Sequence, residues 1–187
     1  MNIETAAHLL EGSVPGTPGT WADLGCGTGT FTLALAGLLG PAARIFAVDK
    51  DGRALAGLRR ALPDPTGVIP VHGDFTAPMR LPGFEGALDG VLFANSLHYV
   101  ADPERVLAFW TARLRPEGRV VFVEYDRRSA NRWVPYPISP ARLEELTAAA
   151  HLAPPVITAT QPSEFTGTLY AAFAKKPRAG AESARER

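Results

Sequence analysis

The sequence predicts an α/β fold with a seven-stranded, mostly parallel sheet whose last strand is antiparallel, and with helices on both faces. From Thr20 onward, short apolar runs alternate with longer helical patterns, which is typical of βαβ units and a parallel sheet. The last two apolar runs, 156–160 and 168–175, are separated by only seven residues. Because seven residues are too few for a crossover helix, we expect these two strands to pair antiparallel.

Each expected strand is a short apolar run bounded by turn residues, and the seven runs cover 20–24, 44–49, 68–73, 88–94, 119–125, 156–160 and 168–175. These strands place one domain at residues 20–176. Residues 1–19 are expected to form an arm with a short helix at 3–10 and a linker rich in glycine and proline. Residues 177–187 have no apolar periodicity and are expected to be a disordered tail.

Further helices are expected at 31–39, 51–62, 103–114 and 140–150. The clearest helix start is Asp102-Pro103, an N-cap followed by proline at the first helical position, and Ser139-Pro140 repeats this pattern. The connection 74–87 contains several prolines and glycines, so we expect at most one irregular turn of helix there.

Length and composition limit the classes of protein that fit. A chain of 187 residues with 46% hydrophobic and 20% charged residues is typical of one globular domain. Its 19 basic residues balance 19 acidic ones, and without a basic excess a nucleic acid is not an expected partner. The single cysteine, Cys26, and four widely spaced histidines predict neither an internal disulfide nor a metal site.

No apolar run approaches the roughly 18 residues needed to cross a bilayer, so membrane insertion is not expected. The first residues, Met-Asn-Ile-Glu, lack the basic segment that opens a signal peptide. We therefore expect a cytoplasmic protein.

A glycine-rich turn follows the first strand. Gly25, Gly27 and Gly29 alternate in the segment Asp23-Leu24-Gly25-Cys26-Gly27-Thr28-Gly29, just before an expected helix. Glycines permit a sharp turn and bring backbone N–H groups close to a ligand. In an open α/β sheet this turn lies at the carboxyl edge, where ligands bind. The same pattern also suits a tight turn that binds nothing.

Two acidic residues end the next two strands at the same edge. Asp49 follows Gly29 by twenty positions, which matches the spacing of a carboxylate that accepts hydrogen bonds from ribose hydroxyls. Asp74 lies in His72-Gly73-Asp74-Phe75, at the end of the third strand. Aspartate is also common in ordinary turns, so Asp74 fits either a ligand contact or a turn.

From Thr20 to Lys175 the chain resembles class I S-adenosylmethionine-dependent methyltransferases, of the broad small-molecule type that includes the ubiquinone and menaquinone biosynthesis enzymes. The segment 23–29 resembles the family's first motif, 95–100 followed by Asp102-Pro103 resembles its fourth-strand motif, and 114–118 resembles the turn before strand five. The resemblance implies a Rossmann-like three-layer sandwich. It also implies S-adenosyl-L-methionine as cofactor, S-adenosyl-L-homocysteine as its product, and no metal.

The resemblance further implies a set of cofactor-binding residues: Asp23, Gly25, Cys26, Gly27, Gly29, Asp49, Lys50, Asp74, Phe75 and Asn95. Asp23 is expected to meet the ammonium of the methionine moiety, whereas a carboxylate there would repel the pyrophosphate of a dinucleotide. The pattern therefore favours a methyltransferase over a nicotinamide-dependent dehydrogenase.

Methyl transfer is an in-line displacement that depends on positioning, and a general base is needed only if the acceptor must lose a proton. His98, just after strand four, is the candidate base, since imidazole suits proton transfer near neutral pH. A packing role for this histidine stays open. Glu124 and Asp126, at the end of strand five, are expected to be a solvated strand end. Residues expected to contact the acceptor are His98, Tyr99, Tyr125, Arg128 and Trp133.

The acceptor is expected to be a small molecule. Its site must be covered by the loop 127–140, by residues 1–19, or by a second subunit in a homodimer. Two alternatives remain open: a non-catalytic subunit that binds S-adenosylmethionine as a scaffold, and, with less support, an RNA methyltransferase. The basic residues of the loop 127–132 are what keeps the second alternative open.

Overall fold

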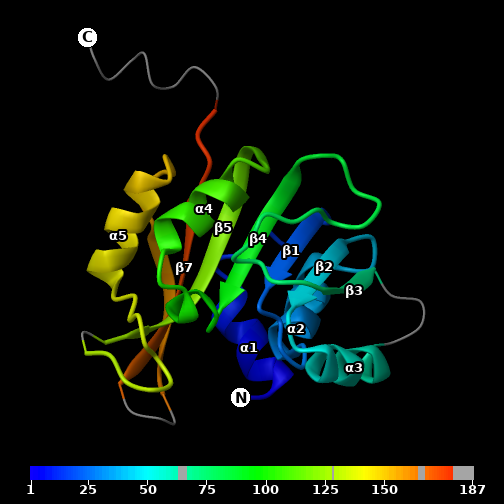
Figure 1. Cartoon of the computed structure of the whole chain (residues 1–187), viewed down its shortest axis with the longest axis horizontal. Helices are drawn as coiled ribbons and strands as arrows, with labels where there is room; N and C mark the ends of the chain where they lie inside the picture. Colours follow the sequence, from blue (N-terminus) through cyan, green and yellow to red (C-terminus); the bar gives the residue numbers. More distant parts are fainter. Residues whose placement is uncertain (63–66, 128, 164–166, 179–187) are drawn as a thin grey trace.

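We describe a computed structural model, which covers residues 1–62, 67–127, 129–163 and 167–178. A single sheet runs through the molecule (Figure 1), with its seven strands in the order β3-β2-β1-β4-β5-β7-β6. The strands are β1 (Thr20–Leu24), β2 (Arg44–Asp49), β3 (Val68–His72), β4 (Leu88–Ala94), β5 (Leu114–Asp126), β6 (Val156–Pro162) and β7 (Thr168–Lys175). This order confirms the predicted fold class.

Strand pairing also agrees with the prediction. β1 pairs in parallel with β2 and β4, β2 with β3, and β4 with β5. β7 lies between β5 and β6 and is antiparallel to both. The short connection between the last two strands therefore forms an antiparallel pair, as expected, and the last strand of the chain is the reversed one.

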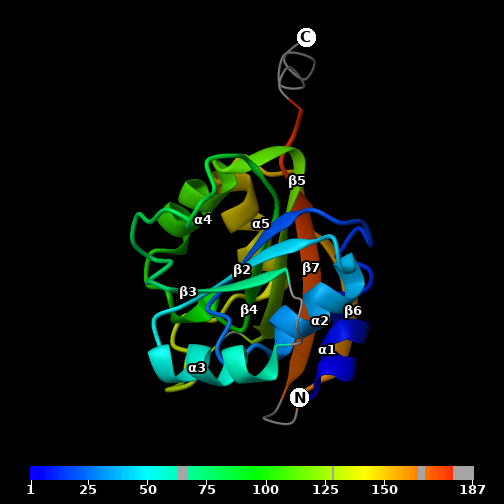
Figure 2. The same ribbon diagram turned by 90° about the vertical axis from the view of Figure 1, so that its right-hand side faces the viewer.

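Helices cover both faces of the sheet: α1 (Ile3–Leu10), α2 (Thr30–Leu39), α3 (Gly52–Ala61), α4 (Pro103–Thr111) and α5 (Pro140–Ala149), with a short 3₁₀ helix η1 (Leu97–Tyr99). One buried cluster joins Trp110 of α4 and Leu143 of α5 to the sheet, and a second joins Leu10, Leu35 and Leu58 of α1, α2 and α3. Figure 2 shows α1 and α2 on the side of the sheet opposite α4 and α5. The structure is thus a three-layer sandwich.

The segment before the first strand packs on the rest of the fold. Leu9 and Leu10 of α1 are buried among the residues of the second cluster. The Ser13 hydroxyl lies 2.6 Å from the hydroxyl of Thr158 on β6, and Arg119 on β5 donates a hydrogen bond of 2.8 Å to the Ser13 carbonyl. These contacts hold α1 against the sheet, with its first turn at the carboxyl ends of the parallel strands.

The largest difference from a predicted boundary is in strand five, which begins at Leu114 and includes the segment that the sequence indicates as a turn. Smaller differences are the end of α4 at Thr111, where residue 114 was predicted, and the end of β6 at Pro162, where residue 160 was predicted. Glu117 donates its backbone N–H to the carbonyl of Lys176, and the Lys176 N–H donates to Gly118, at 2.9 Å in both cases. A β-bulge between Leu88 and Gly90 accommodates the irregularity. Backbone pairing to the end of β7 therefore keeps a Pro-Glu-Gly segment within the strand.

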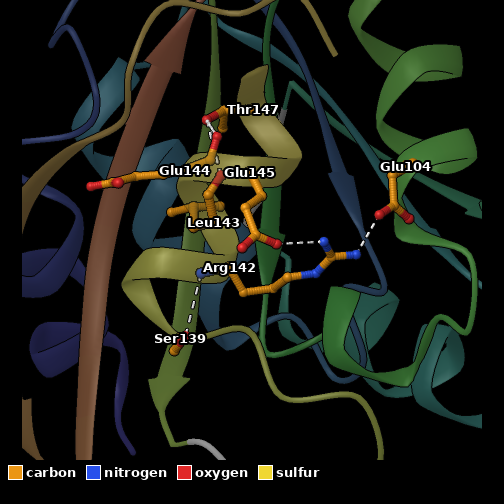
Figure 3. Close-up of polar contacts among 7 residues, drawn as sticks. All are labelled: Glu104, Ser139, Arg142, Leu143, Glu144, Glu145 and Thr147. Atoms are coloured by element: carbon orange, nitrogen blue, oxygen red, sulfur yellow. Dashed lines mark hydrogen bonds and ion pairs between the residues drawn. The ribbon is translucent and has the colours of Figure 1, made fainter. Parts of the chain in front are cut away.

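An arginine links the two helices that cover one face of the sheet (Figure 3). Arg142 of α5 donates hydrogen bonds to Glu104 of α4 and, at 2.8 Å, to Glu145 of its own helix. The Ser139 hydroxyl caps the helix by accepting the Arg142 N–H at 3.3 Å. The link fixes how α4 and α5 lie beside each other.

We expect Arg142→Ala to lower the free energy of unfolding by less than about 1 kcal/mol, because ion pairs between solvent-exposed side chains contribute little. The Arg142 and Glu104 side chains are 39% and 43% exposed. Urea unfolding of the two single variants and the Arg142→Ala/Glu104→Ala double variant measures the coupling. A coupling well above that limit would contradict the expected weak ion pair.

Candidate functional site

Three cavities lie at the carboxyl ends of the parallel strands and share one residue, Asn95, which follows β4. The first cavity, of about 650 Å³, lies between the glycine loop, α1 and the end of β6. The second, of about 440 Å³, lies beside Asp49 and Asp74, and the third, of about 380 Å³, has mainly aromatic walls. Asn95 has a left-handed backbone with φ of 53°. The strand end thus turns sharply where the three cavities meet.

The glycine loop packs closely on its neighbours. A Cβ atom on Gly25 would lie 2.6 Å from the Ser96 Cβ, and one on Gly29 would lie 2.3 Å from Leu58 Cδ1. Both glycines have positive φ, of 79° and 93°, so a side chain at either position would also strain the backbone. Gly25 lines the first and second cavities, whereas Gly29 packs the start of α2 against α3.

Cys26 lines the first cavity together with Gly27. Burial raises the pKa of the Cys26 thiol, and the charges of Asp23 and Asp49 raise it further. The thiol is therefore neutral at physiological pH and is not an activated nucleophile. Cys26 is a small side chain that lines the first cavity.

Asp49 connects the glycine loop to the second cavity. Its Oδ2 accepts a hydrogen bond of 2.7 Å from the Gly27 N–H, and its Oδ1 accepts one of 2.8 Å from the Asp51 N–H. Each carboxylate oxygen has further lone pairs, so the group can also accept hydrogen bonds from a ligand. Asp49 and the neighbouring Lys50 both line this cavity.

Asp74 and Phe75 form the opposite wall of the second cavity. The side chain and backbone of Thr76 donate hydrogen bonds to Asp74 Oδ1, at 2.7 and 2.9 Å, and these bonds lower the pKa of Asp74. The indole of Trp110 donates to the Phe75 carbonyl at 3.0 Å. Asp74 is thus both an ionised cavity residue and the first residue of a turn.

Asp23 lies beneath the glycine loop and is only 1% exposed. Its Oδ2 accepts a hydrogen bond of 2.6 Å from the Thr32 hydroxyl, while Oδ1 has no hydrogen-bond partner among the described residues. Burial raises the pKa of Asp23 to about 7, which the Thr32 hydrogen bond opposes and the Asp49 charge reinforces. Asp23 is not among the residues that line the three cavities.

The third cavity brings together most of the residues predicted to contact an acceptor. His98, Tyr99, Tyr125 and Trp133 line it, and so does Arg127. The predicted contact Arg128 lies outside the described residues. Among the described residues, four aromatic side chains and the Arg127 guanidinium thus line this cavity.

The loop after β5 forms one wall of this cavity. Asn131 folds the loop on itself, since its Oδ1 accepts from the Trp133 and Val134 N–H groups at 2.9 and 2.7 Å. The Tyr136 N–H donates to the His98 carbonyl at 3.0 Å. This loop is therefore held against the turn that carries His98.

Glu124 was expected in a solvated strand end, and that prediction is wrong. Its carboxylate is completely buried and lies 2.6 Å from Nδ1 of His98. It also accepts the His98 backbone N–H at 3.3 Å. Burial raises the pKa of Glu124, and the contacts with His98 oppose that rise. The side chain is buried because β7 pairs with β5 here, with Tyr170 directly across from it.

Residues 1–19 were one of the segments expected to cover the acceptor site, and α1 instead lines the first cavity, together with the end of β6, which the sequence did not indicate. Met1, Asn2 and Thr5 line it from one side, and Gln161 and Pro162 from the other. No local motif marks these residues, because only the folded chain brings them to the glycine loop.

The described part of the chain contains no group of three or more histidine, cysteine, aspartate or glutamate side chains placed to hold a metal ion. No helix within the same residues is long and apolar enough to cross a membrane.

The model of one family, described as a methyltransferase domain, matches residues 22–122. This match covers more than half of the chain and includes the glycine loop, Asp49, Asp74 and the turn with His98. The chain therefore belongs to the methyltransferase-domain family, which confirms the resemblance seen in its motifs.

Two curated relatives match over about a hundred residues. The chain is 35% identical over 104 residues to an uncharacterized 37.1 kDa protein in transposon TN4556 of Streptomyces fradiae, a match that covers 56% of this chain and 29% of that one. It is 30% identical over 102 residues to O-methyltransferase cnsE of Penicillium expansum, covering 54% and 36%. The matches thus span about a third of these relatives.

Solved methyltransferase structures share the fold. The 1,6-didemethyltoxoflavin-N1-methyltransferase of Burkholderia thailandensis, with bound 1,6-didemethyltoxoflavin and S-adenosylhomocysteine, is 26% identical with a TM-score of 0.73, covering 94% of this chain and 78% of that one. N-methyltransferase NodS of Bradyrhizobium japonicum, in complex with S-adenosylhomocysteine, is 19% identical with a TM-score of 0.74, covering 94% and 87%.

Proposed function

We propose that this protein transfers a methyl group from S-adenosylmethionine to a small-molecule acceptor that sits in the third cavity. The observation that carries the proposal is the meeting of three cavities at Asn95. Two of them are lined by motif residues of the methyltransferase-domain family, and the third is lined by aromatic side chains. A donor and an acceptor placed in adjoining cavities can react where the cavities join.

The residues present fit the cofactor. A Cβ on Gly27 would meet no described atom within 4 Å, so the backbone of the loop is open to a ligand in the first cavity. Asp49 keeps lone pairs for ribose hydroxyls, and the unpartnered Oδ1 of buried Asp23 supplies negative charge beneath the loop for an ammonium. Residues that would hold the cofactor are Gly25, Cys26, Gly27, Asp49, Lys50, Asp74, Phe75 and Asn95. S-adenosylmethionine supplies an electrophilic methyl group on a sulfonium.

The protein contributes mainly by positioning and by excluding water. Tyr99 and Tyr125 each line the third cavity and one of the other two, so they stand between the acceptor space and the cofactor space. Holding the acceptor in line with the methyl group converts a bimolecular step into an intramolecular one. The loop that carries Trp133 forms one wall of the third cavity.

The walls of the third cavity favour a flat ring as the acceptor. Tyr99, Tyr125 and Trp133 offer ring faces, and Arg127 offers a guanidinium for a carbonyl or an acidic substituent. The Burkholderia enzyme binds 1,6-didemethyltoxoflavin, which supports an acceptor of this kind. We propose His98, Tyr99, Tyr125 and Trp133 as acceptor contacts.

Calorimetry with S-adenosylhomocysteine, followed by a methylation screen of small planar phenols and N–H heterocycles, tests this function. We expect micromolar or tighter binding of S-adenosylhomocysteine and a methylated product, detected by mass spectrometry. Binding without turnover on any acceptor would favour a non-catalytic scaffold. A salt-sensitive affinity for RNA would favour an RNA methyltransferase. Absence of binding to both forms of the cofactor would contradict the proposal.

A homodimer stays a prediction, which sedimentation analysis can test.

We expect Trp133→Ala to raise the KM for a methylated panel compound by roughly tenfold, since it removes one aromatic wall of the acceptor cavity. The affinity for S-adenosylhomocysteine should remain within twofold, because Trp133 does not line the cofactor cavities. Arg142→Ala serves as the control, because Arg142 lies on α5 and lines none of the three cavities. An equal loss of affinity for cofactor and acceptor would contradict the separate acceptor cavity.

A further inference from the structure

A buried carboxylate and an imidazole contact each other behind the acceptor cavity. His98 Nδ1 and Glu124 Oε2 are 2.6 Å apart, and the two side chains are 2% and 0% exposed. His98 belongs to η1, after β4, and Glu124 belongs to β5, which pairs with β4. Two adjacent strands thus deliver the pair to one point at the carboxyl edge of the sheet.

The arrangement gives the imidazole one fixed orientation. Glu124 accepts the His98 backbone N–H as well as contacting the ring, so both the main chain and the side chain of His98 are held. Among the described residues no hydrogen bond is made by Nε2, while His98 forms part of the acceptor cavity wall. With Nδ1–H donated to Glu124, Nε2 carries the lone pair.

A purely structural pair is a poor explanation for this burial. A buried carboxylate is costly, and replacing such ion pairs with apolar residues is often neutral or stabilising. The nearby Tyr170 hydroxyl donates to the Ile138 carbonyl at 2.8 Å and does not satisfy Glu124. The contact with the imidazole satisfies the buried carboxyl group of Glu124 and holds the His98 ring in place.

We infer that His98 is the general base of this site and that Glu124 is a positioning residue that holds it. The acceptor therefore carries a removable proton on oxygen or nitrogen. This inference rests on the proposed methyl transfer and narrows its substrate class. A planar phenol, enol or ring N–H compound satisfies both the aromatic walls and the base.

In the proposed step, the acceptor O–H or N–H bond breaks and its proton moves to His98 Nε2, while the acceptor heteroatom forms a bond to the methyl carbon. The carbon–sulfur bond breaks, and its electron pair stays on sulfur to leave neutral S-adenosylhomocysteine. The imidazolium of His98 faces the Glu124 carboxylate until it releases the proton to solvent.

Other titratable groups surround the pair and bear on its pH dependence. The rings of Tyr99 and Tyr125 lie 4.4 and 5.9 Å from the His98 ring. Burial raises the pKa of Tyr170, which stands across from Glu124, so this phenol stays neutral. Asp126 ends β5, and Arg127 lines the same cavity. Glu124 is the group that contacts a nitrogen of the His98 ring, through Nδ1 at 2.6 Å.

Nitrogen-15 NMR of the histidine side chains tests the inference without knowledge of the acceptor. We expect His98, in the full chain saturated with S-adenosylhomocysteine, to be the Nδ1–H tautomer with a strongly deshielded Nδ1 proton. In Glu124→Gln that proton should lose its deshielded shift, because an amide oxygen is a weaker acceptor than a carboxylate. Glu145→Gln, an exposed glutamate on α5, is the matched control. An Nε2–H tautomer, or the same Nδ1 proton shift in the wild type and Glu124→Gln, would overturn the inference.

Turnover gives the second readout. His98→Asn keeps a side-chain N–H for Glu124 and removes the base, so unfolding and cofactor affinity should stay near those of the wild type. With 4-methylphenol, whose hydroxyl stays protonated at neutral pH, as the protic probe, we expect kcat to fall by roughly 100-fold or more and KM to change little. Unchanged formation of 4-methylanisole would overturn the inference. Loss of S-adenosylhomocysteine binding in the wild type would instead contradict the proposed function, which keeps the two failures distinct.

Discussion

Replacing Asp49 with alanine should weaken the binding of S-adenosylhomocysteine by at least about 100-fold, which corresponds to roughly 3 kcal/mol. Two effects combine in this variant. The Gly27 N–H loses its 2.7 Å acceptor, so the glycine loop is no longer held at the end of β2. The ligand also loses a carboxylate for its ribose hydroxyls, and hydrogen bonds to a charged group contribute roughly 1.5 to 3 kcal/mol each. Titration calorimetry measures the change directly.

Asp51→Ala is the matched control for this prediction. Asp51 lies two residues further on and caps α3, where its Oδ1 accepts from the Arg53 and Ala54 N–H groups at 2.8 and 3.3 Å. Its loss should cost about 1 kcal/mol of stability while cofactor affinity stays within a few-fold. If Asp49→Ala binds S-adenosylhomocysteine as the wild type does, the ribose assignment of Asp49 is contradicted.

The strands and their pairing could be predicted because the signals are local. Apolar runs bounded by turn residues mark six of the seven strands to within two residues, and the seven-residue connection predicts the antiparallel pair. The start of β5 could not be predicted in this way. Pro116, Glu117 and Gly118 have the composition of a turn, and their place in the strand depends on hydrogen bonds to Lys176, far along the chain.

The same distinction separates the parts of the candidate site. Residues at strand ends, such as Gly25, Asp49 and Asp74, follow from motifs that lie within a few residues of each strand. Glu124 has an unremarkable local sequence, and its contact with His98 spans 26 residues. Its burial depends on β7, which returns to cover β5. A sequence pattern cannot report a partner on a neighbouring strand, whereas the sheet order reports it directly.

The cofactor side and the acceptor side of the site are structurally connected. Asn95 ends the strand next to β1, so the turn that carries His98 begins beside Gly25. The Gly25 contact with Ser96 ties the glycine loop to that turn. Cofactor loop and proposed base are therefore parts of one packed unit, and a change at either position is expected to be felt at the other.

Asp23→Asn should stabilise the free protein and weaken its cofactor binding at the same time. Burial raises the pKa of Asp23 from 3.8 to about 7, so the folded state resists ionisation that the unfolded state accepts. Below about pH 4 Asp23 is protonated in both states, so it does not reduce the free energy of unfolding. As the pH rises to about 7, ionisation in the unfolded state lowers the free energy of unfolding. At one pH unit per 1.36 kcal/mol, the loss amounts to roughly 4 kcal/mol. The asparagine variant has no such loss, because its amide stays neutral and its oxygen can still accept from Thr32.

Urea unfolding at about pH 4 and pH 8 tests the first half of this prediction. The two proteins should be nearly equal at the lower pH, and the variant should be the more stable at the higher pH. Asp51→Asn, at an exposed helix cap, should show no comparable pH-dependent gain. Calorimetry tests the second half of the prediction. In the variant the ammonium of the cofactor no longer faces the negative charge of Asp23, so the cofactor affinity should fall by about tenfold or more. The same pH dependence in wild type and variant would show that Asp23 is not the group that opposes folding at neutral pH, and an unchanged affinity would remove it from the cofactor site.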